Sequence, residues 1–305
     1  MDKKSQKIGY LQVFAAGCLW GTIGLFVTVL SDMGADGALI SLLRILSACV
    51  MMFFIVLFRC GGFKAFCISR QVLVLTLLMG LFCQAIYNLC YSQAIQIAGV
   101  STAAVLLYTA PVFVFLMAVL FFKEPVTAKK LAALALNILG CALTVTGGHF
   151  SALSFAGLGV VMGLLSGFFY GLSTVFSKMA ANKAHPYVIS FYSFLFASVF
   201  LLMLHPPQTL AGGALDLPML LVGAAYGFVA TVLAYAIYMT GLAKPVETSR
   251  VPVIASVETV VAALLGTLVF SESMGIWKAF GIGLVFVSIL VMNMPGHTAK
   301  EKSGD

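Results

Sequence analysis

The chain consists of long apolar runs separated by short polar joints, without the period-two alternation of a membrane β-barrel. About 20 residues rising 1.5 Å each are needed to cross roughly 30 Å of hydrocarbon, and each run is close to that length. Because unpaired backbone groups are costly in lipid, the runs are predicted to be helices. Ten spans are expected, over residues 8–30, 38–58, 72–94, 101–122, 131–147, 156–176, 188–204, 218–240, 251–270 and 276–292.

Composition supports lipid as the main solvent. Of the 305 residues, 62% are apolar or aromatic and only 9% are charged, whereas a soluble domain carries about 25% charged residues. The joints are too short to form a soluble domain, so we expect any function to reside in the bundle. The basic start, with Lys3, Lys4 and Lys7, is interpreted as the beginning of the first span, because the apolar run is too long for a signal peptide.

The charges indicate how the chain is oriented. If the N-terminus is cytoplasmic, all but two of the 17 basic residues fall on the cytoplasmic side, the exceptions being Arg44 and Lys278. The joints on the other side carry the acidic residues Asp32, Asp36, Asp216 and Glu272. This is the distribution that the positive-inside rule requires. The net charge of +7 therefore reports topology in a cell membrane, with both termini cytoplasmic, and calls for no nucleic-acid partner.

The two halves of the chain match each other in sequence. A shift of about 150 residues aligns Gly17 and Gly21 with Gly167 and Gly171, and a slightly smaller shift aligns Pro111 with Glu258. Each half has five spans, an odd number, so the second copy must enter the membrane from the opposite side. We therefore predict an all-α integral membrane protein of ten transmembrane helices, arranged as two inverted five-helix repeats over residues 1–147 and 156–305. Inverted repeats are typical of alternating-access carriers.

Several of these residues carry a family resemblance. The ten spans with their duplication, Trp20-Gly21 in the first span, Arg44 in the second, Pro111 in the fourth and the 256–260 run with Phe270-Ser-Glu272 resemble the EamA-type branch of the drug/metabolite transporter superfamily. The resemblance covers essentially the whole chain. It implies export or import of small metabolites, often amino acids or related amphiphiles, through a cavity between the halves. Family members often have Glu-Pro in the ninth span, whereas this chain has Glu258-Thr259 and lacks the proline that would kink the helix.

Two charged residues fall inside predicted spans. Glu258 lies about 11 Å into the ninth span, where a carboxylate is costly unless it is hydrated, paired or protonated. It is therefore expected to face a cavity and is the candidate for proton coupling, the alternative being a Glu that only ties helices together. Arg44 lies about 9 Å below the outer surface. It is expected to snorkel, to close the outer side or to bind a substrate carboxylate, rather than to pair with Glu258.

Polar and aromatic residues concentrate in a few spans. The third span carries Gln84 and Asn88 on one face, and a largely apolar cavity with a few convergent polar groups is predicted around them. Hydrogen bonds between helices are the alternative role for these residues. The expected pathway residues are Trp20, Arg44, Gln84, Tyr87, Asn88, Tyr91, Tyr108, Tyr170, Tyr235, Tyr238 and Glu258. The paired glycines and Pro111 are expected at packing or hinge contacts between helices.

Other function classes find little support in the sequence. The four histidines fall in joints or span ends, and neither a zinc motif nor a phosphate loop is present, so we expect no enzyme, metal site or cofactor. The seven cysteines are interpreted as small packing residues. A secondary carrier for a small organic metabolite is favoured, with a channel or uniporter as the alternative and a membrane scaffold or receptor as a weaker one. A homodimer is left open.

Overall fold

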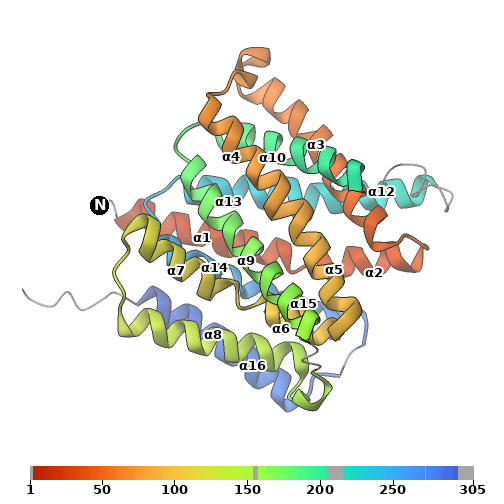
Figure 1. Cartoon of the computed structure of the whole chain (residues 1–305), viewed down its shortest axis with the longest axis vertical. Coiled ribbons are helices and arrows are strands. Elements are labelled where there is room, and N and C mark those ends of the chain that lie inside the picture. The colour runs from red at the N-terminus through yellow and green to blue at the C-terminus, as the bar shows by residue number, and fades with distance from the viewer. Residues whose placement is uncertain (1–2, 154–156, 205–215, 272, 295–305) are drawn as a thin grey trace, which may run out of the picture.

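Helices account for all the regular secondary structure in the residues that this computed structural model describes, which are 3–153, 157–204, 216–271 and 273–294 (Figure 1). Ten helical spans are long and apolar enough to cross a membrane, at the places that the sequence predicts. The predicted all-α membrane fold is therefore confirmed. Glu272 of the predicted motif lies outside the described residues. Five spans are single helices: α3 (Gly37–Arg59), α8 (Ala128–Thr146), α9 (Gly157–Ala180), α10 (Pro186–Leu204) and α16 (Ile276–Asn293).

The other five spans are interrupted, four of them at equivalent places in the two halves; the first span breaks between Trp20 and Ile23, whereas its counterpart, the sixth, is the continuous helix α9. The third and eighth each contain a π-helical segment, and the fourth and ninth each break near the middle. Such irregularities are frequent at functional sites. In the first half, the first span consists of α1 (Lys3–Trp20) and α2 (Ile23–Asp32). The third consists of α4 (Arg70–Gly80), the π-helix Leu81–Ile86 and α5 (Tyr87–Ala98), and the fourth of α6 (Val100–Leu107) and α7 (Ala110–Phe122). In the second half, the eighth span consists of α12 (Leu217–Tyr226), the π-helix Gly227–Leu233 and α13 (Ala234–Leu242), and the ninth of the 3-10 turn Thr248–Arg250, α14 (Val251–Ala255) and α15 (Val257–Val269).

Most of the extensive helix contacts join the two halves. Helix α1 packs on α13, α5 on α9, α3 on α10, and α8 on α16. In terms of spans these pairs are first with eighth, third with sixth, second with seventh and fifth with tenth, which is the pattern of two repeats related by a pseudo-two-fold axis. Helices α8 and α16 form one edge of the bundle and α3 lies at the other, with the interrupted spans between them (Figure 1).

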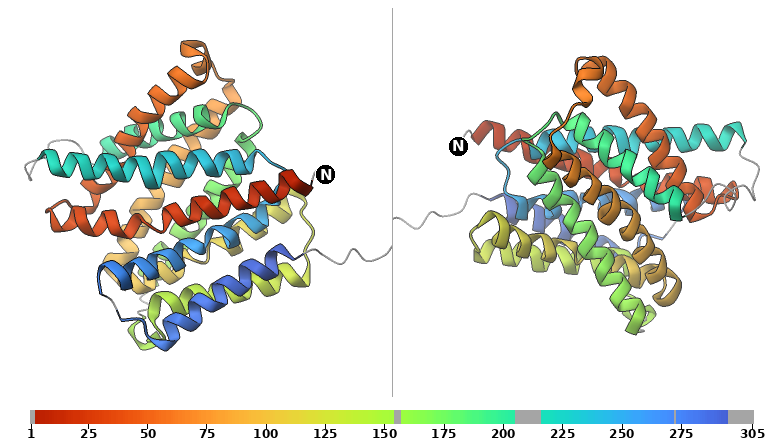
Figure 2. Two further views of the ribbon diagram at one scale, coloured as in Figure 1. Left: turned by 180° about the vertical axis from the view of Figure 1, so that it is seen from behind. Right: turned by 45° about the horizontal axis from the view of Figure 1, so that its top comes forward.

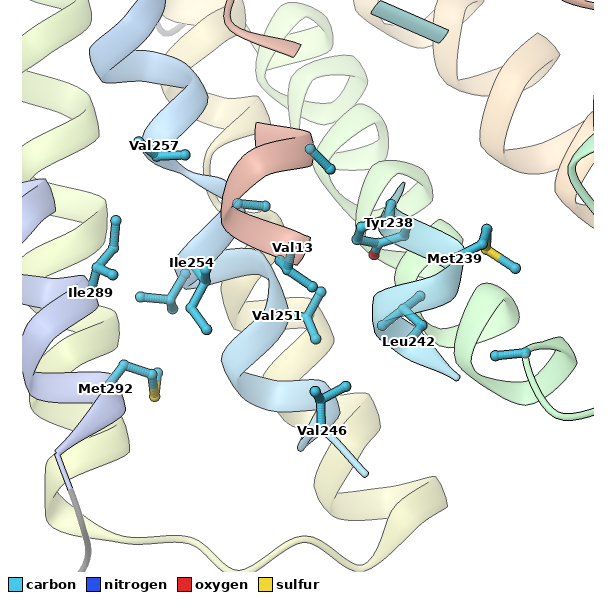
Figure 3. Packing of buried hydrophobic residues seen from close by; sticks show 14 of the residues in the cluster. Val13, Tyr238, Met239, Leu242, Val246, Val251, Ile254, Val257, Ile289 and Met292 are labelled. Carbon is cyan, nitrogen blue, oxygen red and sulfur yellow. The ribbon is translucent and has the colours of Figure 1, made fainter. Parts of the chain in front are cut away.

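The start of α1 and the last turn of α16 lie at the same end of the bundle (Figure 2). Val13 of α1, Ile254 of α14 and Ile289 of α16 belong to the buried hydrophobic cluster there (Figure 3). We call this the basic end, because the described span ends and joints there carry Lys3, Lys4, Lys7, Arg59, Lys64, Arg70, Lys123, Lys129, Lys130, Lys178, Lys183, Lys244 and Arg250. The opposite end carries Asp32, Asp36, Asp216 and Lys278.

Candidate functional site

A small cavity at the centre of the bundle is lined by the first, fourth, sixth, eighth and ninth spans, four of which are interrupted. Its volume is about 30 Å³, enough for a few water molecules but too small for a metabolite. Side chains or helices must therefore move before a metabolite can occupy it. Seven residues that the sequence singles out line this cavity: Trp20, Tyr108, Pro111, Tyr170, Tyr235, Tyr238 and Glu258.

Glu258 lies in the first turn of α15, directly after the break in the ninth span. The hydroxyl of Tyr170 on α9 donates to its two carboxylate oxygens at 3.2 and 3.3 Å. Within the described part of the chain no basic residue forms an ion pair with Glu258, and Arg44 does not, in agreement with the prediction from depth. The N-terminus of a helix favours a negative charge, so the break itself helps to stabilise the carboxylate.

The break in the ninth span is held by Ser256 of the predicted motif together with Asn137 and Ser288, which the sequence analysis did not single out. Asn137 of α8 donates to the hydroxyl of Ser256 at 2.5 Å and to that of Ser288 on α16 at 3.2 Å. Ser256 in turn donates to Val253 O at 2.7 Å. The ninth span therefore breaks at Ser256, without a proline after Glu258, and Asn137 fixes the turn that positions the carboxylate. The amide of Asn137, in the largely apolar fifth span, was the sequence signal that could have pointed to this contact.

Aromatic rings surround Glu258 on several sides. The ring centroid of Trp20 lies 5.4 Å from that of Tyr235 and 5.0 Å from that of Tyr238. Tyr87 stacks with Tyr91 at 6.0 Å and is tilted against Tyr170 at 5.8 Å. The predicted aromatic residues of the first, third, sixth and eighth spans are thus brought together in one cluster.

Some of the predicted polar residues pair with each other. Gln84 donates to the hydroxyl of Tyr235 at 3.0 Å, and Tyr238 donates to Thr174 at 3.0 Å. Asn88 donates to the backbone oxygen of Gln84 at 2.5 Å. Gln84 and Tyr238 therefore make the interhelical hydrogen bonds that were the alternative to a pathway role.

Arg44 lies apart from Glu258, toward the opposite end. Its guanidinium is 5.5 Å from the ring centroid of Tyr226, which stacks on Phe26. A second cavity, of about 320 Å³, lies between α3 and α5, which are not packed closely together. We call this cavity the vestibule. Asn88, Ser92 and Gln96 follow one another at four-residue intervals along its wall, so α5 presents a polar stripe that the sequence analysis missed beyond Asn88.

The paired glycines lie where each half meets a broken helix of the other. A Cβ atom on Gly17 would lie 2.7 Å from the backbone oxygen of Ala255, just before the break in the ninth span. One on Gly167 would lie 2.9 Å from the backbone oxygen of Leu106, next to the break in the fourth span. Gly21 and Gly171 make the next contacts along the same helices. The close packing is therefore present, while the hinge role of these glycines remains a prediction.

The basic end is closed by charged residues to which the sequence analysis assigned no role in a site. Glu124, in the joint after α7, accepts hydrogen bonds from the backbone of Thr248 at 2.5 Å and Ser249 at 3.1 Å, and from the hydroxyl of Ser249. It thereby satisfies the free N–H groups at the start of the ninth span. Lys130 lies 3.4 Å from Glu124 and 2.6 Å from Glu247.

Arg250 and Lys178 extend this contact. Arg250 pairs with Glu247 at 2.8 Å and donates to Met292 O at 3.0 Å, and Lys178 donates to Leu242 O and Lys244 O, each at 2.9 Å. Burial alone would raise the pKa of Glu247, but the hydrogen bonds and charges of Lys130 and Arg250 lower it below its usual value. We call Glu124, Lys130, Glu247 and Arg250 the basic-end network; it joins the two halves of the chain.

Comparison with known proteins gives consistent results. The model of the EamA-like transporter family matches residues 7–146 and again 157–294. An uncharacterized transporter of Archaeoglobus fulgidus is 30% identical over 295 residues, covering 94% of this chain and 97% of that protein. The pseudopaline exporter CntI of Pseudomonas aeruginosa is 30% identical over 125 residues, 41% of this chain and 43% of that protein. A solved structure superposes with a TM-score of 0.77 at 19% identity, covering 93% of this chain and 96% of that one, and shares the fold.

Proposed function

The chain belongs to the EamA-like transporter family, a branch of the drug/metabolite transporter superfamily, and is a multi-pass membrane transporter; on that premise we propose that it is a secondary carrier for a small organic amphiphile. We further propose that it works by alternating access in the cell membrane, with the basic end and both termini in the cytoplasm. The repeats over 1–147 and 156–305 would then be the two moving halves. Similarity to an exporter supports the outward direction.

One observation carries the proposal: Glu258 is a carboxylate that pairs with no basic residue among those the structure describes, in an aromatic cavity at the crossing of the two halves. The faces of Trp and Tyr rings attract cations, and a carboxylate pairs with them. A solute with an apolar body and an ammonium group, such as an amino acid or a related amine, suits these walls. We propose that Glu258 exchanges the cationic group of the solute for a proton, so that the two are bound in turn.

The test begins with a binding screen of purified protein against amino acids, amines and nucleosides by thermal shift, because a ligand stabilises the state that binds it. Compounds that shift the unfolding temperature are then measured in proteoliposomes for saturation and counterflow. A carrier predicts both. Flux that is fast and does not saturate would make the protein a channel and overturn the proposal.

Glu258→Gln tests the coupling separately. The variant keeps the shape of the side chain but cannot bind a proton in exchange, so we expect net transport to lose its pH dependence. Tyr170→Phe is the matched control, because it removes the hydrogen-bond donor and leaves the carboxylate. An unchanged pH profile in Glu258→Gln would remove proton coupling and leave Glu258 a structural residue.

A further inference from the structure

A large groove at the basic end is separate from the central cavity. It lies between α1 and α16, has a volume of about 780 Å³ and is open to the surroundings. Helices α1 and α16 both pack on α14 and not closely on each other, so α14 forms the floor (Figure 3). In a membrane, a gap between two spans faces lipid, and lipid is the solvent that must fill it.

The residues of the groove are arranged in two layers. At the end of the bundle its wall is polar, and one helical turn deeper every wall is apolar. On α1, the polar residues Lys7 and Tyr10 are each followed one turn deeper by an apolar residue, Leu11 and Phe14. Ile254 lies one turn deeper than Arg250 at α14, and Ile289 one turn deeper than Asn293 on α16. From Lys3 to Phe14 the wall rises about 16 Å, roughly half the hydrocarbon thickness of a bilayer. The groove therefore has the shape and polarity of one leaflet's lipid.

The polar layer is positively charged. Lys3 and Lys7 form no ion pair with any residue that the structure describes, and Arg250 lies 5.9 Å from the ring centroid of Tyr10. Glu247, which pairs with Arg250 and Lys130, is the acidic residue of the basic-end network next to the groove. The lining of the groove thus contains three cations, of which Arg250 is paired with Glu247.

The corresponding positions of the other repeat show that the charge does not follow from the fold. Shifting Lys7 and Tyr10 into the second half gives Gly157 and Val160, and shifting Arg250 and Asn293 into the first half gives Ala103 and Val145. The equivalent positions of the other repeat therefore carry uncharged residues. The cations are a specific feature of the basic end.

We propose that this groove binds an anionic phospholipid from the leaflet at the basic end. The phosphate of the headgroup is bound by Lys3, Lys7 and the guanidinium of Arg250. One acyl chain lies along the apolar layer, which consists of Leu11, Phe14, Ile254 and Ile289. The bound lipid bridges α1, α14 and α16 and contacts a member of the basic-end network. It therefore stabilises the state in which this end is closed. The inference rests on membrane insertion and not on the proposed substrate or coupling.

The experiment uses the full chain, delipidated in detergent and titrated with phosphatidylglycerol or with phosphatidylcholine of the same acyl chains. Binding is followed by native mass spectrometry and by thermal unfolding. We expect one phosphatidylglycerol to be retained and to raise the unfolding temperature, with phosphatidylcholine weaker. Replacing both Lys3 and Lys7 by Gln removes two surface cations and should weaken phosphatidylglycerol binding about thirtyfold.

Arg59→Gln with Lys64→Gln is the matched control, since both residues are exposed at the same end but lie outside the groove. The control should bind phosphatidylglycerol as the unmodified chain does. Equal loss in the two double variants would show general attraction to a charged surface and overturn the proposal. Stabilisation by inorganic phosphate or glycerol 3-phosphate alone would also overturn it, because the acyl layer would then contribute nothing. Retained binding in the Lys3 and Lys7 variant would contradict the assigned cations.

Discussion

The two ends of the bundle share one fold but are held in different ways. At the basic end, Glu124 from the first half caps the ninth span of the second half, and Lys130 lies between Glu124 and Glu247. At the opposite end, the vestibule separates α3 from α5, and Arg44 contacts the aromatic ring of Tyr226 and pairs with no carboxylate in the described part of the chain. Because the repeats give both ends the same helix pattern, a few side chains set which end is closed.

The charged residues of the two ends have different roles. Those at the basic end hold the halves together, whereas Arg44 contacts the ring of Tyr226 and Glu258 lines the central cavity. A carrier needs such an arrangement, because the contacts that close one side must be weak enough to break when the other side closes. Four variants test this difference, beginning with the largest expected effect.

Lys130→Met should destabilise the protein most. It removes the cation between Glu124 and Glu247, whose side chains are only 10% and 27% exposed, and leaves two carboxylates facing each other. Breaking such a buried pair costs about 3 kcal/mol. The free energy of unfolding in mixed detergent measures it, with Lys64→Met, an exposed lysine at the same end, as control. Equal stability of the two variants would show that the network does not hold this end.

Asn137→Leu should have the next largest effect. It removes the hydrogen bonds to Ser256 and Ser288, at about 1 kcal/mol each, for a loss of about 2 kcal/mol in unfolding free energy. Transport should fall further than stability, because Glu258 follows the turn that Asn137 holds. Thr144→Val is the control on the same helix, since the hydroxyl of Thr144 donates to the backbone oxygen of Gly140 within α8 and not to another span. A transport loss no greater in Asn137→Leu than in Thr144→Val would refute the positioning role.

Glu247→Gln should cost less, because Lys130 keeps Glu124 as a partner. The pKa of Glu247 is lowered from its usual 4.5, so the ionised form stabilises the folded state above that pH and the contribution is lost as the pH falls below it. Thermal unfolding of the parent protein and the variant should therefore differ at neutral pH and converge in acid. Parallel curves over the whole range would contradict the ion pairing.

Arg44→Met should have the smallest effect on stability, about 1 kcal/mol, because the side chain that loses its partner is the uncharged Tyr226 and no described carboxylate is left unpaired. Uptake of a solute found in the binding screen should fall much more than stability does. If Arg44→Met were destabilised as strongly as Lys130→Met, charged contacts would stabilise both ends equally. That result would contradict the difference between the two ends.

Much of the fold follows from the sequence because lipid imposes a simple rule on helix length. All ten spans and the clustering of Trp20, Tyr170, Tyr235 and Glu258 could be predicted from hydropathy and repeat alignment. The irregular segments could not. The π-helices at Leu81–Ile86 and Gly227–Leu233 have no proline to mark them, and the break at Ser256 depends on Asn137 from another span.

The basic-end network was hidden for a different reason. Glu124 and Thr248 are 124 residues apart and belong to joints in different halves. In the sequence Lys130 and Arg250 are indistinguishable from the other basic residues of the basic end. Their pairing depends on how the halves pack, and span counting alone does not contain that information.

The account is tested most directly by distances across the two ends, measured by electron spin resonance on a cysteine-free chain in lipid nanodiscs. One pair of spin labels at Val126 and Lys244 spans the basic end, and another at Asp32 and Gln96 spans the opposite end. Introducing Lys130→Met should lengthen the first distance and shorten the second. A change at the basic end without the opposite change at the other, or none at either, would contradict alternating access.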